Sequence, residues 1–385
     1  MAECSATPSP VATAIASAGY SLFLTALPLS GDDPQGCFLS PLSILYALSL
    51  ALNGAGPGSS THTELLRVVG GPSTGQQQQE AELNSELGRA MALLNQQCST
   101  SAVDGPSSEL ILANSLWTAP GAQLKAAYVE QMRTLFTATA SVASNGARDI
   151  NSWVADVTRG MIQDLVQSDD FEVVLANAIY FKGLWEEAFK KTLTQPGDFT
   201  TASGAIKQVD MMKHEFKSAV GIRRRGTYDA VVLPYKGGAF SAVALLPVPG
   251  VTVAEALRDW AEAPQDYAPL GKLWVKLPKF KVTSQLSLKP VLKSLGVQAA
   301  FSPGADFSRM AERGLFVSDA VHKAVVEVDE EGTVAAAATR IMLTRSAMPE
   351  PPRELVFDRP FAFIIRHNPT ALPAFIGAVN DPSPA

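Results

Sequence analysis

The segment Pro41–Asn53 is the strongest constraint that this sequence places on its own fold, because its pattern predicts a helix that is nearly all apolar. Its polar side chains are few, and Gly54 follows as a helix stop. A surface helix keeps one polar face, whereas a helix that is apolar on every side must be buried on every side. We therefore expect this segment inside the core and not on the surface.

The rest of the chain divides into a helical first third and a strand-rich remainder. Three further helices are expected at Val11–Leu27, Ser60–Val68 and Glu80–Gln97, with a Gly/Pro/Gln loop over residues 70–79. From Glu172 onward strands dominate, and they are expected at Val173–Phe181, Ala230–Pro234, Ser241–Pro247, Val356–Arg366 and Ala374–Val379. The stretch Trp274–Val282, interrupted at Pro278, is expected to be an edge or bulged strand. Helices followed by hairpin-connected strands indicate an α+β fold.

Length and composition limit the classes of function. At 385 residues the chain exceeds the usual size of one domain, but no linker separates two cores, so we expect a single domain over residues 1–385. A formal net charge of −6 argues against a sequence-independent nucleic-acid binder. The four histidines lie far apart and no metal-ligand spacing occurs. We expect neither a metal nor a cofactor.

The cysteines and the N-terminus bear on the cellular compartment. Cys4, Cys37 and Cys98 are odd in number and unclustered, which fits reduced thiols better than a disulfide framework. The first basic residue is Arg67, so the apolar N-terminal stretch lacks the positive region of a signal peptide. No apolar run reaches membrane-spanning length without polar breaks. These features predict a cytoplasmic protein without a membrane segment, with leaderless secretion as the alternative.

The sequence of the segment Glu330–Pro352 does not predict a permanent helix or strand. It begins Glu-Glu-Gly-Thr, continues through an alanine run to Thr339, and ends in a proline-rich stretch before the next strand. A run of about 20 residues without regular structure is uncommon inside a compact domain and is usually functional. An ordinary alanine helix is the alternative, since alanine is the best helix former.

Alternation within this segment argues against a permanent helix. If it becomes a strand, one face is small or apolar throughout, and that face consists of Thr333, Ala335, Ala337, Thr339, Ile341 and Leu343. Arg340 falls on the opposite face, where it can remain in water. A permanent loop has no need of this pattern. The segment is therefore predicted to be exposed in one state and inserted as a strand in another.

These residues resemble the hinge of inhibitory serpins, and the resemblance extends along nearly the whole chain. The family's signatures recur in the right order at residues 38–44, 52–55, 175–185, 277–280, 321–324, 359–361 and 375–377. Val334 departs from the pattern, because the family usually has glutamate there, but it lies on the outward face. Asn53 and residues 56–58 also depart from the family pattern, in a turn whose sequence is less constrained.

The resemblance implies a fold of roughly eight to nine helices around three β-sheets, with an exposed reactive-centre loop at about residues 330–352. It also implies a monomeric inhibitor without catalytic residues of its own. The serine of a target protease would attack the loop and form an acyl-enzyme. The hinge would then insert as a new strand and trap the protease. The hinge residues would be Glu330, Glu331, Gly332, Thr333, Ala335, Ala337 and Thr339.

The scissile bond is predicted at Arg345–Ser346, because trypsin-like proteases recognise arginine in an acidic pocket. Counting from Gly332 with the family's commonest spacing places the cut after Ser346, before Ala347. Some members have loops one residue shorter, and the chemistry favours Arg345. Arg345 as an ordinary solvated loop charge is the plain alternative, and a cut near Met342 or Leu343 by a chymotrypsin- or subtilisin-like enzyme is the secondary one.

Two further groups of residues correspond to positions that support the mechanism in the family. A polar network beneath the point where the main sheet opens would consist of Ser40, Ser43, Asn177 and His322. The site where the hinge first enters the sheet would consist of Trp185, Lys279 and Glu330, with Lys279 and Glu330 as an ion pair or as a plain surface pair. A polyanion site is not expected, since Arg89 is the only basic residue of 80–97.

Two rival functions remain open at this point. A non-inhibitory member of the same family, a chaperone or a carrier, would tend to have a bulky or charged hinge, and this hinge is small throughout. A serine hydrolase is the remote rival, because residues 71–75 match Gly-x-Ser-x-Gly around Ser73. A nucleophile elbow needs a strand before the serine and a helix immediately after it, whereas a helix is expected before Ser73 and polyglutamine follows.

Overall fold

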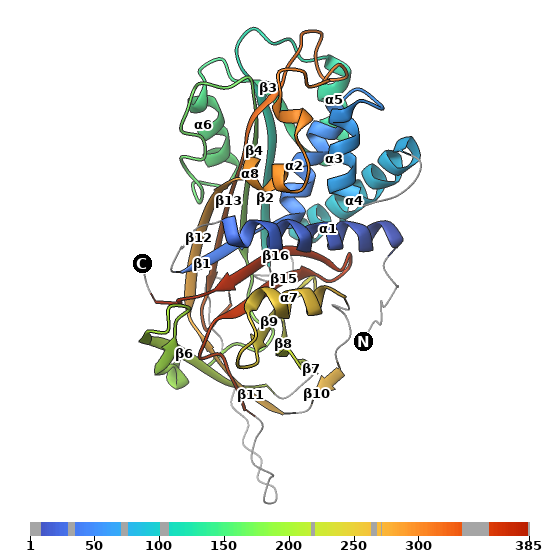
Figure 1. The fold of residues 1–385 in the computed structure, drawn as a ribbon. Helices are drawn as coiled ribbons and strands as arrows, with labels where there is room; N and C mark the ends of the chain where they lie inside the picture. The colour runs from blue at the N-terminus through green and yellow to red at the C-terminus, as the bar shows by residue number, and fades with distance from the viewer. Residues whose placement is uncertain are drawn as a thin grey trace, which may run out of the picture.

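Three β-sheets and eight α-helices make up the part of the chain that the computed structural model describes, which is residues 9–29, 35–70, 76–100, 108–216, 220–262, 268–270, 272–332 and 354–383. This confirms the expected α+β class (Figure 1). The helices are α1 (Pro10–Ala26), α2 (Pro41–Gly54), α3 (Ser60–Gly70), α4 (Gln76–Thr100), α5 (Ala126–Phe136), α6 (Ala147–Val157), α7 (Val253–Glu262) and α8 (Lys289–Ser294).

The five-stranded sheet, which we call the main sheet, runs the length of the molecule (Figure 1). Its strand order is β12 (Phe280–Ser287), β13 (Val317–Val328), β4 (Val173–Lys182), β2 (Glu109–Thr118) and β3 (Thr139–Val142). At its centre β13 and β4 are parallel neighbours, and each is antiparallel to the strand on its other side. A parallel pair of strands is the arrangement into which one strand antiparallel to both would fit.

The two other sheets lie at one end of the main sheet (Figure 1). The seven-stranded sheet is ordered β1 (Gly36–Leu39), β16 (Leu372–Val379), β15 (Phe361–His367), β9 (Phe240–Pro247), β8 (Tyr228–Pro234), β7 (Val220–Arg225) and β10 (Ala268–Leu270). The four-stranded sheet is ordered β14 (Glu354–Val356), β11 (Leu273–Pro278), β6 (Ile206–Phe216) and β5 (Gln195–Thr200).

Helix α2 lies in the core, as its apolar sequence predicts. All of its residues from Pro41 to Gly54 are buried, and it contacts the main sheet at β2 and β4, the seven-stranded sheet at β16, and helices α1, α3 and α5. The Ser40 hydroxyl caps its first turn by accepting the Ser43 N–H, and Pro41 follows at the first helical position, where no N–H is needed. The core is therefore organised around this one helix.

Some expected boundaries were wrong. Helix α4 begins at Gln76, so the glutamine run belongs to the helix, which is consistent with the good helix propensity of glutamine. Strand β2 lies in the third of the chain expected to be mainly helical, and β3 lies between that third and Glu172. The chain also changes sheets at Lys279, so Trp274–Val282 contains part of β11, an inner strand, and part of β12, the edge strand. Residues 356–366 likewise divide between β14 and β15.

The helical run Pro10–Leu29 is, against expectation, long and apolar enough by length and composition to cross a membrane, with a mean hydropathy of 1.4. In this fold, however, one face of α1 packs on α2 and β16, and Ile15, Leu22 and Phe23 are buried there. Burial in the core accounts for these apolar side chains.

Candidate functional site

The pairing of β13 with β4 ends before the strands do. The parallel register runs from Val317↔Val173 to Val325↔Tyr180, whereas β13 continues to Val328 and β4 to Lys182. β13 remains paired with β12 on its other side as far as Val328. The two central strands therefore separate at one end, which is the end from which the predicted hinge leaves the sheet.

A buried hydrogen-bonded group joins these two strands to α2, and we call it the His322 network. It consists of Ser40, Ser43, Asn114, Asn177 and His322, all of which are buried. The Ser40 backbone N–H donates to Nε2 of His322 at 3.0 Å, and Asn177 Nδ2 donates to the Ser43 carbonyl oxygen at 2.9 Å and to Asn114 Oδ1. His322 Nδ1 is hydrogen-bonded to Asn177 Oδ1. The network thus spans three strands and one helix.

The hydrogen bonds of His322 fix its tautomer. Because Nε2 accepts from Ser40, the ring proton must lie on Nδ1, from which it is donated to Asn177. Burial lowers the pKa of His322 to about 3, so the ring is neutral at physiological pH. Because both ring nitrogens are hydrogen-bonded, the neutral ring can be buried without a charged partner.

The chain turns sharply directly after β13. Asp329 and Gly332 exchange two backbone hydrogen bonds, with Asp329 N–H donating at 2.8 Å and Gly332 N–H donating at 3.3 Å. The Asp329 carboxylate also accepts the N–H groups of Glu331 and Gly332. Gly332 has a φ of +134°, and a Cβ there would lie 2.1 Å from the Gly183 carbonyl oxygen, so this position requires glycine. The four residues form a tight two-residue turn, here called the hinge turn.

Trp185, from the segment after β4, holds the hinge turn from the opposite side. Its backbone N–H donates to the Glu331 carbonyl oxygen at 2.9 Å, and its indole Nε1–H donates to the Asp329 carbonyl oxygen at 3.0 Å. The indole ring is buried and stacks on Tyr235 with ring centroids 4.4 Å apart. Phe189 N–H adds a hydrogen bond of 2.7 Å to the Glu330 carbonyl oxygen. The beginning of the hinge is therefore anchored to a rigid aromatic surface.

The two glutamates of the hinge turn have different partners. Glu330 is buried and forms an ion pair with Lys279 at 3.1 Å, and it accepts a hydrogen bond from Thr194 at 2.8 Å. Burial alone would raise its pKa, but hydrogen bonds from the backbone, Thr194 and Lys279 outweigh burial and lower the pKa below the ordinary value. Glu331 pairs with Lys191. Both carboxylates thus stabilise the hinge turn in the position that it has in this structure.

The structure places the predicted site residues in two groups that lie within the described part of the chain. Ser40, Ser43, Asn177 and His322 come together in the network, and Trp185, Lys279 and Glu330 meet at the hinge turn with Glu331 and Gly332. Other predicted residues lie outside the described residues, namely Thr333, Ala335, Ala337, Thr339, Arg345, Ser346 and Ser73. The elements that flank Ser73 are helices α3 and α4, which is not the strand-before-serine arrangement of a nucleophile elbow.

Sequence reasoning missed Asn114, Thr194, Lys191 and Asp329. Asn114 lies opposite Asn177 on β2, a strand that was not expected. Lys191 begins the short 3-10 helix Lys191–Leu193, and Thr194 follows it. Only the tertiary fold brings these two residues to the hinge turn. The polar pair Asn114 and Ser115 in the otherwise apolar stretch Leu110–Leu116 was the one available signal.

Comparisons with known proteins agree with this geometry. The family model described as Serpin (serine protease inhibitor) matches residues 21–382. The chain is 34% identical over 374 residues to Iris of Ixodes ricinus, covering 91% of this chain and 94% of that protein. It is 35% identical over 368 residues to the plasma serine protease inhibitor of Homo sapiens, covering 92% of this chain and 86% of that protein. The native stressed conformation of Arabidopsis AtSerpin1 superposes with a TM-score of 0.81 at 26% identity, covering 97% of this chain and 99% of that one. The chain therefore belongs to the serpin family of serine protease inhibitors, and it is an inhibitor by family and not an enzyme.

Proposed function

We propose that this protein inhibits a serine protease as a suicide substrate, with the segment 330–352 as its reactive-centre loop. The observation that supports this most directly is the central pair of the main sheet. β13 and β4 are parallel and hydrogen-bonded to each other, but this pairing ends before the ends of the strands on the hinge side. The hinge turn follows β13 at that point. A hinge strand that enters this gap would run antiparallel to both neighbours.

Insertion would supply the free energy that traps the protease. The new strand would gain ladder hydrogen bonds on both edges, each worth about 0.5–1.5 kcal/mol net, and would bury its small inward face, so the sum is on the order of 10 kcal/mol. Before insertion, the Trp185 and Lys279 contacts hold the hinge turn outside the sheet. The native fold would therefore be kinetically stable and able to release this energy only after the loop is cut.

The target is proposed to be a trypsin-like protease that cuts Arg345–Ser346. An acidic specificity pocket would bind the Arg345 guanidinium, and the protease serine would attack the Arg345 carbonyl carbon. The acyl-enzyme ester would then link that serine to Arg345 while the new amino terminus departs at Ser346. Hinge insertion would have to finish before water hydrolyses this ester.

We also propose that residues 1–385 form one domain, since the family model spans most of the chain. The protein would act as a monomer in the cytoplasm. Cys37, whose side chain the structure describes, is a buried free thiol, which is consistent with a reducing compartment.

Incubation of the purified protein with trypsin tests the function. A complex that survives denaturing electrophoresis, with a released peptide that begins at Ser346 by mass spectrometry, is the expected result. Cleavage at this bond without a stable complex would instead show a substrate and would favour a non-inhibitory carrier or chaperone. A released peptide that begins at Ala347 would move the bond to Ser346–Ala347, and one that begins near Met342 or Leu343 would indicate a different class of target.

A further inference from the structure

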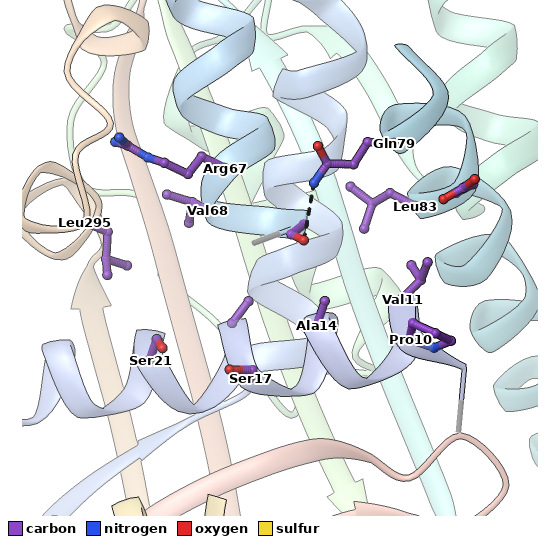
Figure 2. A pocket seen from close by; sticks show the side chains of 13 residues that line it. Pro10, Val11, Ala14, Ser17, Ser21, Arg67, Val68, Gln79, Leu83 and Leu295 are labelled. Atoms are coloured by element: carbon purple, nitrogen blue, oxygen red, sulfur yellow. Dashed lines mark hydrogen bonds between the residues drawn. The ribbon is translucent and has the colours of Figure 1, made fainter. Parts of the chain in front are cut away.

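A cavity of about 600 Å³ lies between α1, α3 and α4, away from the main sheet's hinge end (Figure 2). Helix α1 forms its floor, α3 and the N-terminal half of α4 form its walls, and Leu295 lies beyond the end of α8. Its volume is in the range of sites that hold small organic molecules. None of the residues that line it belongs to the His322 network or to the hinge turn.

The surface of the cavity is mainly apolar. Its half-buried or buried apolar side chains are Val11, Ala14, Ala18, Val68, Leu83 and Leu295, and Gln79 is a half-buried polar side chain of the lining. Val11 and Ser21, which both line it, are ten residues apart on α1, and this corresponds to about 15 Å along the helix axis. The cavity is thus an elongated groove and not a round pocket.

Charge is distributed unevenly along this groove. Figure 2 shows Arg67, Leu295 and Ser21 toward one end, and Pro10, Val11 and Leu83 toward the other. The Arg67 guanidinium donates from Nη2 to the Gly296 carbonyl oxygen at 3.2 Å, which fixes one of its nitrogens. Within the described residues Arg67 has no carboxylate partner, so the remaining donors of its planar fork can bind an anion.

We propose that this groove binds the anion of a medium-chain fatty acid. The carboxylate would accept from Arg67, and the alkyl chain would cover Val68, Ala14, Val11 and Leu83. An extended chain of dodecanoate matches the length of the groove.

Direct titration with dodecanoate below its micelle concentration tests this proposal, with calorimetry as the measurement. Binding of one equivalent to the wild-type protein is expected, and Arg67→Glu should weaken it by about tenfold or more, because the charge-assisted hydrogen bonds are lost and a repulsive charge replaces them. Arg89→Glu is the matched control. Arg89 is an exposed arginine of α4 that pairs with Glu86 and does not line the cavity. It should bind dodecanoate like the wild type.

A second pair of variants tests the position of the alkyl chain. Ser17 and Thr13 are both exposed on α1, but only Ser17 lines the cavity. Ser17→Trp should fill the groove and abolish binding, whereas Thr13→Trp should not change it. The thermal midpoints of all four variants serve as the check on folding, so the result does not depend on protease inhibition. Equal binding of dodecylamine and dodecanoate, or unchanged binding by Arg67→Glu or Ser17→Trp, would overturn the proposal.

Discussion

His322 on β13 and Asn177 on β4 face each other across the central parallel pair of the main sheet, and His322 Nδ1 donates a hydrogen bond to Asn177 Oδ1. This bond crosses the seam between the two strands. A strand that enters between β13 and β4 must therefore break it. The same histidine ring also accepts the N–H of Ser40 at the start of α2, so separation of the strands disturbs the helix cap as well.

Replacement of His322 by alanine should lower the unfolding midpoint. The substitution leaves the Ser40 N–H and Oδ1 of Asn177 without partners in a buried site, and each unsatisfied buried group costs about 1–3 kcal/mol. Urea unfolding measures the loss. Lys323→Ala is the control, because Lys323 lies on the opposite face of the same strand and donates to a carbonyl oxygen at the surface. An equal midpoint shift in both variants would contradict the role given to His322.

Stability should fall as the pH falls below about 6.5. Each histidine of the unfolded chain takes up a proton near pH 6.5, whereas burial holds the pKa of His322 at about 3 and that of His367 at about 4. Between these values the unfolded state binds more protons than the folded state, so the free energy of unfolding decreases by up to about 1.4 kcal/mol per pH unit for each histidine. Urea midpoints from pH 7 to 5 should therefore decline less steeply for His322→Gln than for the wild type. Identical slopes would show that His322 titrates normally in the folded protein.

Substitution of Arg345 by alanine should greatly weaken inhibition of trypsin-like proteases while the thermal midpoint stays nearly unchanged. Removal of the guanidinium removes the group that an acidic specificity pocket binds, and exposed loop residues contribute little to stability. Inhibition rates against trypsin provide the measurement. A variant that inhibits trypsin at the wild-type rate would show that the bond is elsewhere.

Cleavage of the loop should stabilise the protein. A cut normally loosens a fold, but insertion of the freed hinge would raise the thermal midpoint by tens of degrees if it supplies on the order of 10 kcal/mol. Differential scanning calorimetry of the intact and the cut protein compares the two states. A midpoint that is unchanged or lower after cleavage at Arg345 would favour a non-inhibitory member of the family.

Arginine at Thr333 or Ala335 should convert the inhibitor into a substrate. Both positions lie on the face that must pass over the core, and burial of an unpaired guanidinium costs several kcal/mol. Insertion would slow, and the acyl-enzyme would hydrolyse first. Val334→Arg, on the outward face, is the control and should inhibit almost normally. The ratio of covalent complex to cleaved product on a denaturing gel measures the outcome, and equal behaviour of the three variants would reject the alternating-face model.

Local sequence patterns predicted the elements that depend on neighbouring residues. The buried helix α2 and the hairpin of β8 and β9 are confirmed. The start of α7 is equally local, because Thr252 and Glu255 exchange hydrogen bonds in a capping box. Each is determined by contacts within a few residues, so periodicity and turn chemistry are sufficient.

Pairings between distant segments could not be predicted in the same way. Asn114 meets Asn177 only because β2 lies beside β4, and Lys279 reaches Glu330 only because the chain leaves one sheet for another at that residue. The resemblance to a family placed His322 beside Asn177, and no periodicity would have done so. Strand partners depend on the assembled sheet, which local preferences do not encode.

The hinge turn has a kinetic consequence. Because Asp329 and Gly332 already exchange both backbone hydrogen bonds, the uncut protein contains the closed end of a β-hairpin, and the new strand needs no separate nucleation step. If the hairpin lengthens in the same register, Thr339, seven residues after Gly332, comes opposite His322, seven residues before Asp329. Changes at Thr333 would then affect the start of strand insertion, and changes at His322 would affect a later step. The two kinds of variant should therefore slow different stages of the same insertion reaction.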